Sequence, residues 1–207
     1  MLFRSNPGYA TAHHWYADYL TAMGRSDEAL AEGEQAAALD PLSASIRGTL
    51  GTALYMARHY AQAITELRSS LDLDSGVAST HTYLAYCYEQ QGLLDQAVAE
   101  TQRGLQVAPG NIYLLAELGR LSALRGDRAG ALRVAADLEK SRKADPFSES
   151  IAYIYAALGD NDRAFQFLRK AEQSRSVTLI WAKVDPIFDS LRGDPRFADL
   201  LRSLRLG

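Results

Sequence analysis

The chain has 207 residues, 47% of them hydrophobic, which is enough apolar material for a stable core. No stretch approaches the roughly 20 uninterrupted apolar residues that cross a bilayer, and the start lacks the apolar centre of a secretory signal. The net charge of -3 argues against the basic surface that nucleic-acid binding needs, and the single cysteine cannot form an internal disulfide. We therefore expect neither a membrane nor a nucleic acid as partner. The cytoplasm is the default compartment, and the periplasm stays open if a transmembrane segment lies upstream.

Small residues recur along the chain at a spacing of 34. One column holds Ala29, Ala63, Ala97 and Ala131, with Ala164 one residue early, and a second holds Ala17, Gly51, Ala85, Gly119 and Ala152. A period of 34 is the length of a helix-turn-helix repeat, and small residues let its two helices pack closely. The spacing predicts five two-helix repeats over 10–43, 44–77, 78–111, 112–144 and 145–176. Residues 1–9 would be the remnant of a preceding repeat.

Other columns mark the elements within each repeat, numbered from Ala10 as position 1. Position 11 of the first helix is a core position that holds Leu20, Leu54, Tyr88, Ser122 and Tyr155, of which Ser122 is the one weak member. Position 15 holds Gly24, Gly92, Gly126 and Gly159, whereas the second repeat has Arg58. Glycine there predicts a left-handed cap after the first helix.

After the fifth repeat, residues 177–207 predict capping helices. The pairs Asp185-Pro186 and Asp194-Pro195, like Asp145-Pro146 earlier, are typical of an N-cap followed by a first-turn proline. Apolar residues at 197, 200, 201 and 204 predict a short amphipathic helix that packs on the fifth repeat. The segment 177–184 has a strand-like composition, but a lone strand would leave its backbone groups unpaired, so we expect a helix there.

The columns in register resemble the tetratricopeptide repeat family over residues 7–176. The resemblance implies an all-α fold, an α-solenoid of five repeats wound into a right-handed superhelix with a helical cap. Leu138 at a usually small position and Lys143 in place of the usual proline depart from the family pattern, so we expect a changed superhelical angle at the fourth repeat. The tail WAKVDPIFDSLRGDPRFADLL resembles the closing segment of bacterial arrays behind winged-helix regulators, nucleotide cyclases and serine/threonine kinases. Phe3 and Pro7 match the end of a preceding repeat, which suggests a fragment or a gene that lost its upstream part.

In the resembling family, the first helices line a concave groove. The positions that face it carry over to His14, Asp18, Thr52, Tyr55, Met56, Thr82, Tyr86, Glu89, Gln90, Tyr113, Arg120, Glu149 and Tyr153. Such a groove is rich in tyrosine and has no lysine, which suits a peptide or protein segment. The alternative is that an individual tyrosine only packs against neighbouring repeats. Arg120 could likewise bind a carboxylate of a partner or pair with a nearby acidic residue.

No pattern in the sequence predicts catalysis, a cofactor or a metal. His13 and His14 are adjacent and would point about 100° apart on a helix, which is poor geometry for one metal. There is no phosphate-binding glycine loop and no nucleophile motif with a partner base. We therefore expect a non-catalytic interaction module, a regulatory or scaffold part of a bacterial signalling or transcription-regulating protein. The alternative is a self-association domain that forms a homodimer through Trp15, Tyr16 and Tyr19 of the first repeat.

Overall fold

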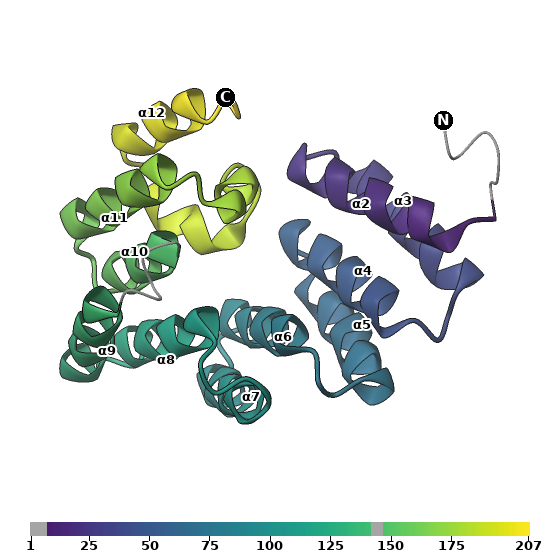
Figure 1. Ribbon diagram of the computed structural model, residues 1–207, viewed down its shortest axis with the longest axis horizontal. Helices are drawn as coiled ribbons and strands as arrows, with labels where there is room; N and C mark the ends of the chain where they lie inside the picture. Colours follow the sequence, from purple (N-terminus) through teal and green to yellow (C-terminus); the bar gives the residue numbers. More distant parts are fainter. Residues whose placement is uncertain (1–7, 142–146) are drawn as a thin grey trace. The chain divides into compact units, whose positions relative to one another are not determined.

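The computed structural model describes residues 8–141 and 147–207, and within these ranges it contains helices and turns but no strand (Figure 1). The first helices of successive pairs are α2 (Ala10–Ala22), α4 (Ala44–Met56), α6 (Ala78–Gln90), α8 (Ile112–Leu124) and α10 (Ser148–Ala157). The second helices are α3 (Ser26–Leu39), α5 (Tyr60–Leu73), α7 (Leu94–Val107), α9 (Arg128–Lys140) and α11 (Asn161–Gln173). The expected all-α class is confirmed. Lys143 and the Asp145-Pro146 pair lie outside the described residues.

The helix bounds follow the period of the sequence. The starts of α2, α4, α6 and α8 are 34 residues apart, and so are their ends. The helix α10 is shorter, with 10 residues instead of 13, and starts 36 residues after α8. The first helix of the fifth pair is thus shifted and shortened, whereas the changed superhelical angle expected at the fourth repeat stays a prediction.

The chain divides into two compact units, which we describe separately. The N-terminal unit covers Met1–Ala97 and the C-terminal unit Val98–Gly207, so the division falls within α7. In the N-terminal unit, α2 packs on α3 and α4 on α5, and each second helix also contacts the next first helix. In the C-terminal unit, α8 packs on α9 and α10 on α11, while α10 also contacts α8 and α9. Both units are therefore built from stacked antiparallel pairs.

The turn after each first helix is left-handed. Gly24, Gly92, Gly126 and Gly159 have φ values between 72° and 85°, and Arg58 adopts the same conformation with φ 67°. Positive φ carries no side-chain penalty for glycine but is strained for arginine. The predicted caps at position 15 are thus confirmed, including the one that lacks glycine.

The C-terminal cap consists of two 3-10 helices, η2 (Val177–Trp181) and η3 (Pro186–Leu191), followed by the α-helix α12 (Pro195–Ser203). The carboxylates of Asp185 and Asp194 accept hydrogen bonds from the backbone N–H groups of Ile187 and Arg196, as the two Asp-Pro pairs predict. The segment 177–184 forms no strand, although its helical part is a 3-10 helix of five residues.

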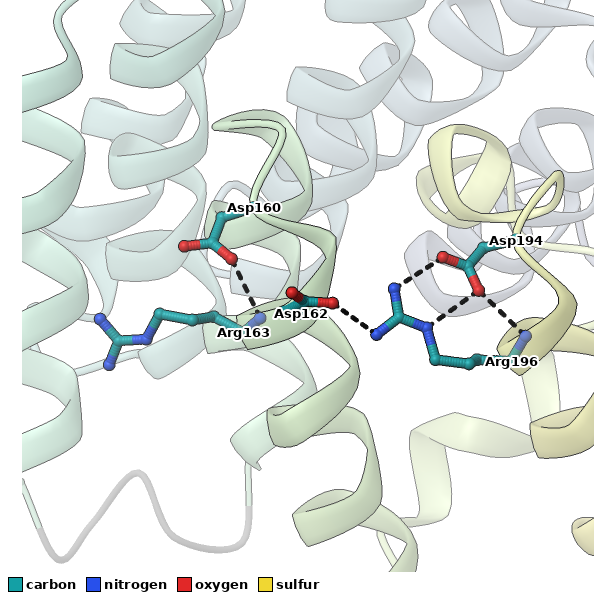
Figure 2. A network of polar contacts seen from close by, with 5 residues as sticks. All are labelled: Asp160, Asp162, Arg163, Asp194 and Arg196. Atoms are coloured by element: carbon teal, nitrogen blue, oxygen red, sulfur yellow. Dashed lines mark hydrogen bonds and ion pairs between the residues drawn. The ribbon is translucent and has the colours of Figure 1, made fainter.

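A polar network ties the cap to α11 (Figure 2). The guanidinium of Arg196 on α12 donates to Asp194 at 2.7 Å and to Asp162 on α11, also at 2.7 Å. It also lies 4.4 Å from the ring centroid of Phe165. Beneath this exposed network, Phe188 of η3 is fully buried and contacts Phe197 of α12, with ring centroids 5.6 Å apart. The Arg196 contacts therefore link α12 to α11 of the fifth pair, on which the amphipathic C-terminal helix is predicted to pack.

Candidate partner-binding surface

The first helices of the N-terminal unit form a pocket of about 240 Å³. Its lining is contributed by α4, the start of α6 and the turn between α5 and α6, and consists of Ala44, Ser45, Gly48, Thr49, Thr52, Asp74, Val77, Ser79, Thr80 and Tyr83. Most polar groups in this lining are hydroxyls, and no lysine or arginine takes part. We call this site the hydroxyl pocket.

Two side chains of α2 extend the polar character of the hydroxyl pocket. The Nε2 atom of His14 lies 2.7 Å from the hydroxyl of Thr49, and the carboxylate of Asp18 lies 3.8 Å from the same Nε2. Partial burial raises the pKa of Asp18, an effect that the neighbouring His14 opposes. The Asp18 side chain remains 45% exposed, so it can still meet a partner.

The tyrosines of the N-terminal unit mostly pack against one another. The ring of Tyr55 lies between 5.6 and 6.0 Å from the rings of Tyr60, Tyr83 and Tyr86, measured between centroids. Tyr55 is 1% exposed and Tyr86 is 6% exposed, so neither offers a partner much surface. Tyr83 is half-buried and lines the hydroxyl pocket. For Tyr55 and Tyr86 the structure therefore favours the packing alternative.

The remaining predicted residues of this unit divide by burial. Met56 and Thr82 are buried, and the Thr82 hydroxyl donates to the carbonyl of Ala78 at 3.1 Å. Thr52 is half-buried and donates to the carbonyl of Gly48 at 3.0 Å, which leaves its oxygen free to accept a further hydrogen bond. Glu89 and Gln90 are half-buried at the end of α6. The accessible predicted residues are thus His14, Asp18, Thr52, Glu89 and Gln90.

In the C-terminal unit, two of the predicted residues, Glu149 and Tyr113, contact each other. The Oε1 atom of Glu149 accepts hydrogen bonds from Thr178 of η2 at 2.7 Å and from Tyr113 of α8 at 3.5 Å. Burial and the Glu149 carboxylate raise the pKa of Tyr113 to about 12. Glu149 is fully buried and Tyr153 is 8% exposed, with its ring edge-on to Phe188 at 5.3 Å. These residues connect the cap to α8 and α10, and among the predicted ones Tyr113 is half-buried whereas Glu149 and Tyr153 are buried.

Arg120 is engaged by an acidic neighbour on its own helix. Its guanidinium donates to both carboxylate oxygens of Glu117, at 2.8 and 3.1 Å, and both side chains are buried. Burial raises the pKa of Glu117 well above its ordinary value. Of the two alternatives for Arg120, the structure shows the intramolecular pair rather than an arginine open to a partner's carboxylate.

Of the residues that line the hydroxyl pocket, only Thr52 is among the predicted groove residues, and the hydroxyl-bearing side chains that the prediction misses are Ser45, Thr49, Ser79, Thr80 and Tyr83. Two columns of the sequence contain a signal for them, because Ser45 and Ser79 are 34 residues apart, as are Thr49 and Tyr83. Hydroxyl-bearing residues thus recur at positions 2 and 6 in the second and third repeats. The groove positions of the family include position 5 but not position 6, so Thr49 and Tyr83 are not among the predicted residues.

Cys87, the single cysteine of the chain, is buried. Burial raises the pKa of the Cys87 thiol to about 12, so it stays protonated at neutral pH and is a poor nucleophile. In the described ranges, no three His, Cys, Asp or Glu side chains lie close enough to hold a metal ion. None of the helices described there is both long and apolar enough to cross a membrane.

Comparison with family models finds the tetratricopeptide repeat at two places. One model of this repeat matches residues 49–112, which include most of the hydroxyl pocket, and another matches residues 149–176, which include most of the α10–α11 pair. A search of curated proteins gives no significant match.

Several solved structures share the fold. A thermophilic TPR protein of Thermus thermophilus superposes with a TM-score of 0.66 and 20% identity, over 93% of this chain and 99% of that one. YrrB, described as a TPR protein with an unusual peptide-binding site, superposes with a TM-score of 0.56 and 17% identity, over 87% of this chain and 93% of that one. A chain of the APC/C hetero-tetramer Cut9-Hcn1 gives a TM-score of 0.67 and 18% identity, over all of this chain and 42% of that one. At these identities the likeness shows the fold alone.

Proposed function

Because this chain contains tetratricopeptide repeats, we propose that it is a non-catalytic protein-interaction module that binds an extended peptide segment in the groove formed by the first helices of its N-terminal unit. The hydroxyl pocket carries this proposal. Its position between consecutive first helices corresponds to the groove that the family resemblance implies. Serine and threonine hydroxyls both donate and accept hydrogen bonds, so they suit the N–H and C=O groups of an extended backbone.

The charges around the hydroxyl pocket favour a basic peptide. Asp74 lines the pocket, Asp18 flanks it through His14 and Thr49, and no lysine or arginine lies in the lining. A lysine or arginine side chain of the peptide would therefore meet carboxylates with no lysine or arginine of the lining to compete for them. The same carboxylates would repel an acidic peptide, so the site should bind basic peptides more tightly than acidic ones.

A selection experiment tests this proposal. A library of random 12-residue peptides displayed on phage is selected against the purified chain, and the dissociation constants of enriched peptides are measured by fluorescence anisotropy. We expect the enriched peptides to carry at least one lysine or arginine. Thr52→Phe, which fills the hydroxyl pocket, should weaken their binding at least about tenfold.

Matched variants make the result specific. Thr65→Phe places the same side chain on the exposed face of α5, outside the pocket, and should leave binding unchanged. Asp18→Asn should weaken binding of the basic peptides, whereas Asp72→Asn, an exposed position on α5, should not. The proposal is wrong if no peptide is enriched, or if Thr52→Phe and Thr65→Phe bind alike.

The resemblance of the tail to bacterial signalling arrays suggests the biological setting. We propose that the module is a regulatory or scaffold part of a signalling or transcription-regulating protein. Sequencing the DNA upstream of Met1 tests this directly. An in-frame winged-helix, cyclase or kinase domain would support the assignment, and an in-frame stop codon before any such domain would contradict it.

One observation favours self-association as a second candidate function. Trp15 and Tyr19 of α2 and the C-cap residue Met23 follow one another at intervals of four residues and are 61%, 54% and 50% exposed. Tyr16 stacks on Tyr19 with centroids 6.1 Å apart, which keeps the aromatic surface ordered. Such a stripe can pair with its own copy about a two-fold axis. Sedimentation velocity should then show a dimer that Trp15→Ser converts to a monomer, and a monomer at high concentration would rule this out.

A further inference from the structure

The fourth repeat has a small side chain at position 11, where the other repeats have a large one. Position 11 holds leucine or tyrosine in four repeats but Ser122 in the fourth. A second column changes with it, because Arg68 of the second repeat corresponds to Gln102 of the third, 34 residues later. Ser122 on α8 and Gln102 on α7 therefore correspond to Tyr88 on α6 and Arg68 on α5.

Where both large side chains are present, they fill the space between a first helix and the preceding second helix. The Tyr88 hydroxyl accepts hydrogen bonds from the Arg68 guanidinium at 2.6 and 3.0 Å, and the Tyr88 residue is 5% exposed. Tyr155 occupies position 11 of the fifth repeat and is 2% exposed, and its hydroxyl donates to Glu139 of α9, the preceding second helix, at 2.5 Å. Arg163 of the following helix α11 lies 4.2 Å from the Tyr155 ring centroid. In the third and fifth repeats, a buried phenol ring at position 11 thus forms a hydrogen bond with a polar side chain of the preceding second helix.

In the fourth repeat the same space is open. The C-terminal unit has a pocket of about 690 Å³ whose lining includes Val98 and Gln102 of α7, Leu118 and Ser122 of α8 and Val134 of α9. The Ser122 hydroxyl donates to the carbonyl of Leu118 at 2.9 Å, so its hydrogen is already used within the helix. The lining therefore combines the apolar side chains of Val98, Leu118 and Val134 with the amide of Gln102, and it also includes the charged residues Arg125, Asp127, Arg133 and Asp137. Its volume is in the range of natural ligand sites.

We propose that this pocket binds a tyrosine side chain of a protein partner, which takes the place that Tyr88 occupies one repeat earlier. The ring would lie on Leu118 and Val134, and the phenol hydroxyl would accept a hydrogen bond from the Gln102 amide as Tyr88 does from Arg68. Asp137 and Arg133 of α9 also line the pocket and are exposed, so they can contact the charged or polar groups that flank the tyrosine. This site is distinct from the hydroxyl pocket and takes a different chemical group.

The probe for this site is 4-methylphenol, the side-chain analogue of tyrosine, with N-acetyltyrosine amide as a larger version. Titration is followed through the methyl signals of Val98, Leu118 and Val134 in ¹H–¹³C NMR spectra. We expect saturable shifts of these methyl groups. Ser122→Tyr, which supplies the missing ring from within the chain, should weaken binding at least about tenfold.

Two further variants complete the test. Ser190→Tyr adds a tyrosine at an exposed position of η3 and should bind the probe like the unmodified chain. Gln102→Leu, at an exposed position that tolerates change, should reduce the preference for 4-methylphenol over toluene about three- to tenfold. The proposal is overturned if the three methyl groups do not shift with either phenol. It is also overturned if Ser122→Tyr, shown to be folded by circular dichroism, binds the probe as the unmodified chain does, or if Gln102→Leu keeps the full preference.

Discussion

Gly51 lies where two antiparallel helices of the second repeat are in closest contact. A Cβ atom built on Gly51 would lie 2.6 Å from Cγ of Leu67 and 3.2 Å from the Leu67 backbone nitrogen. The side chain of Leu67 could turn away, but the backbone could not move without shifting α5. The small residues at position 8 thus have a steric cause, at the contact between the first and second helices of a repeat.

We predict that Gly51→Ala lowers the free energy of unfolding by about 1–2 kcal/mol, since overpacking outweighs the better helix propensity of alanine. Urea unfolding followed by circular dichroism measures this. Gly110→Ala is the control, because a Cβ there would meet nothing within 4 Å, and it should change stability by less than about 0.5 kcal/mol. Equal stability of Gly51→Ala and the unmodified chain would contradict the steric account.

In the described repeats, every residue at position 15 has a left-handed conformation. Four of them are glycines, and the fifth is Arg58. Relief of this strain exceeds the entropy that glycine loses on folding. Arg58→Gly should therefore raise the free energy of unfolding by about 0.5–1 kcal/mol. Gly92→Ala makes the opposite change at the equivalent turn, where φ is 74°, and should lower stability by about 1 kcal/mol. Changes of the same sign in the two variants would show that backbone strain does not decide stability here.

At the scale of elements, the C-terminal cap contains both buried aromatic contacts and partly exposed ion pairs, so their contributions to stability can be compared. Phe188 is fully buried between Tyr153 and Phe197, with centroid distances of 5.3 and 5.6 Å. Arg196 makes ion pairs with Asp162 and Asp194, but its side chain is 33% exposed. Buried aromatic contacts stabilise far more than ion pairs in contact with water.

Phe188→Ala should accordingly lower the free energy of unfolding by about 3–5 kcal/mol, whereas Arg196→Ala should cost less than about 1 kcal/mol. Raising the salt concentration should remove most of the Arg196 effect and leave the Phe188 effect intact. If Arg196→Ala destabilises the chain as much as Phe188→Ala, the network in Figure 2 rather than the apolar core holds the cap.

The sequence predicts the helices well because the same pattern of residues occurs in each repeat. Small residues, a left-handed turn and an apolar stripe recur every 34 residues, so an exception such as Arg58 does not obscure the turn. The segment 177–184 has no such repetition, and a composition argument could not distinguish a 3-10 helix from an α-helix.

The partner-binding surface is less predictable, since a helix position fixes the direction of a side chain but not the size of its neighbours. Tyr55 and Tyr86 stand at groove positions of the family pattern, yet both are buried, and the rings of Tyr60, Tyr83 and Tyr86 lie close to that of Tyr55. The Arg120–Glu117 pair, by contrast, could be predicted locally, because residues three apart on a helix are neighbours.

At the scale of the whole molecule, the repeats are a common framework with different surfaces. The hydroxyl pocket of the N-terminal unit is lined mainly by hydroxyl groups and has carboxylates beside it, whereas the pocket at Ser122 in the C-terminal unit combines apolar and charged side chains. Both arise from small or polar substitutions at positions of one repeat pattern. A partner that carries both a basic segment and a tyrosine could use either surface, and the two sites can be tested independently.

The central claim, that the first helices of the N-terminal unit bind a peptide, is tested most directly by backbone amide NMR with a selected basic peptide. We predict that the largest chemical-shift changes fall on residues 45–52 of α4 and 79–83 of α6, which line the hydroxyl pocket, and that the exposed face of α5 around Thr65 stays unchanged. Changes confined to α5, or absent from both α4 and α6 at saturating peptide, would contradict the claim.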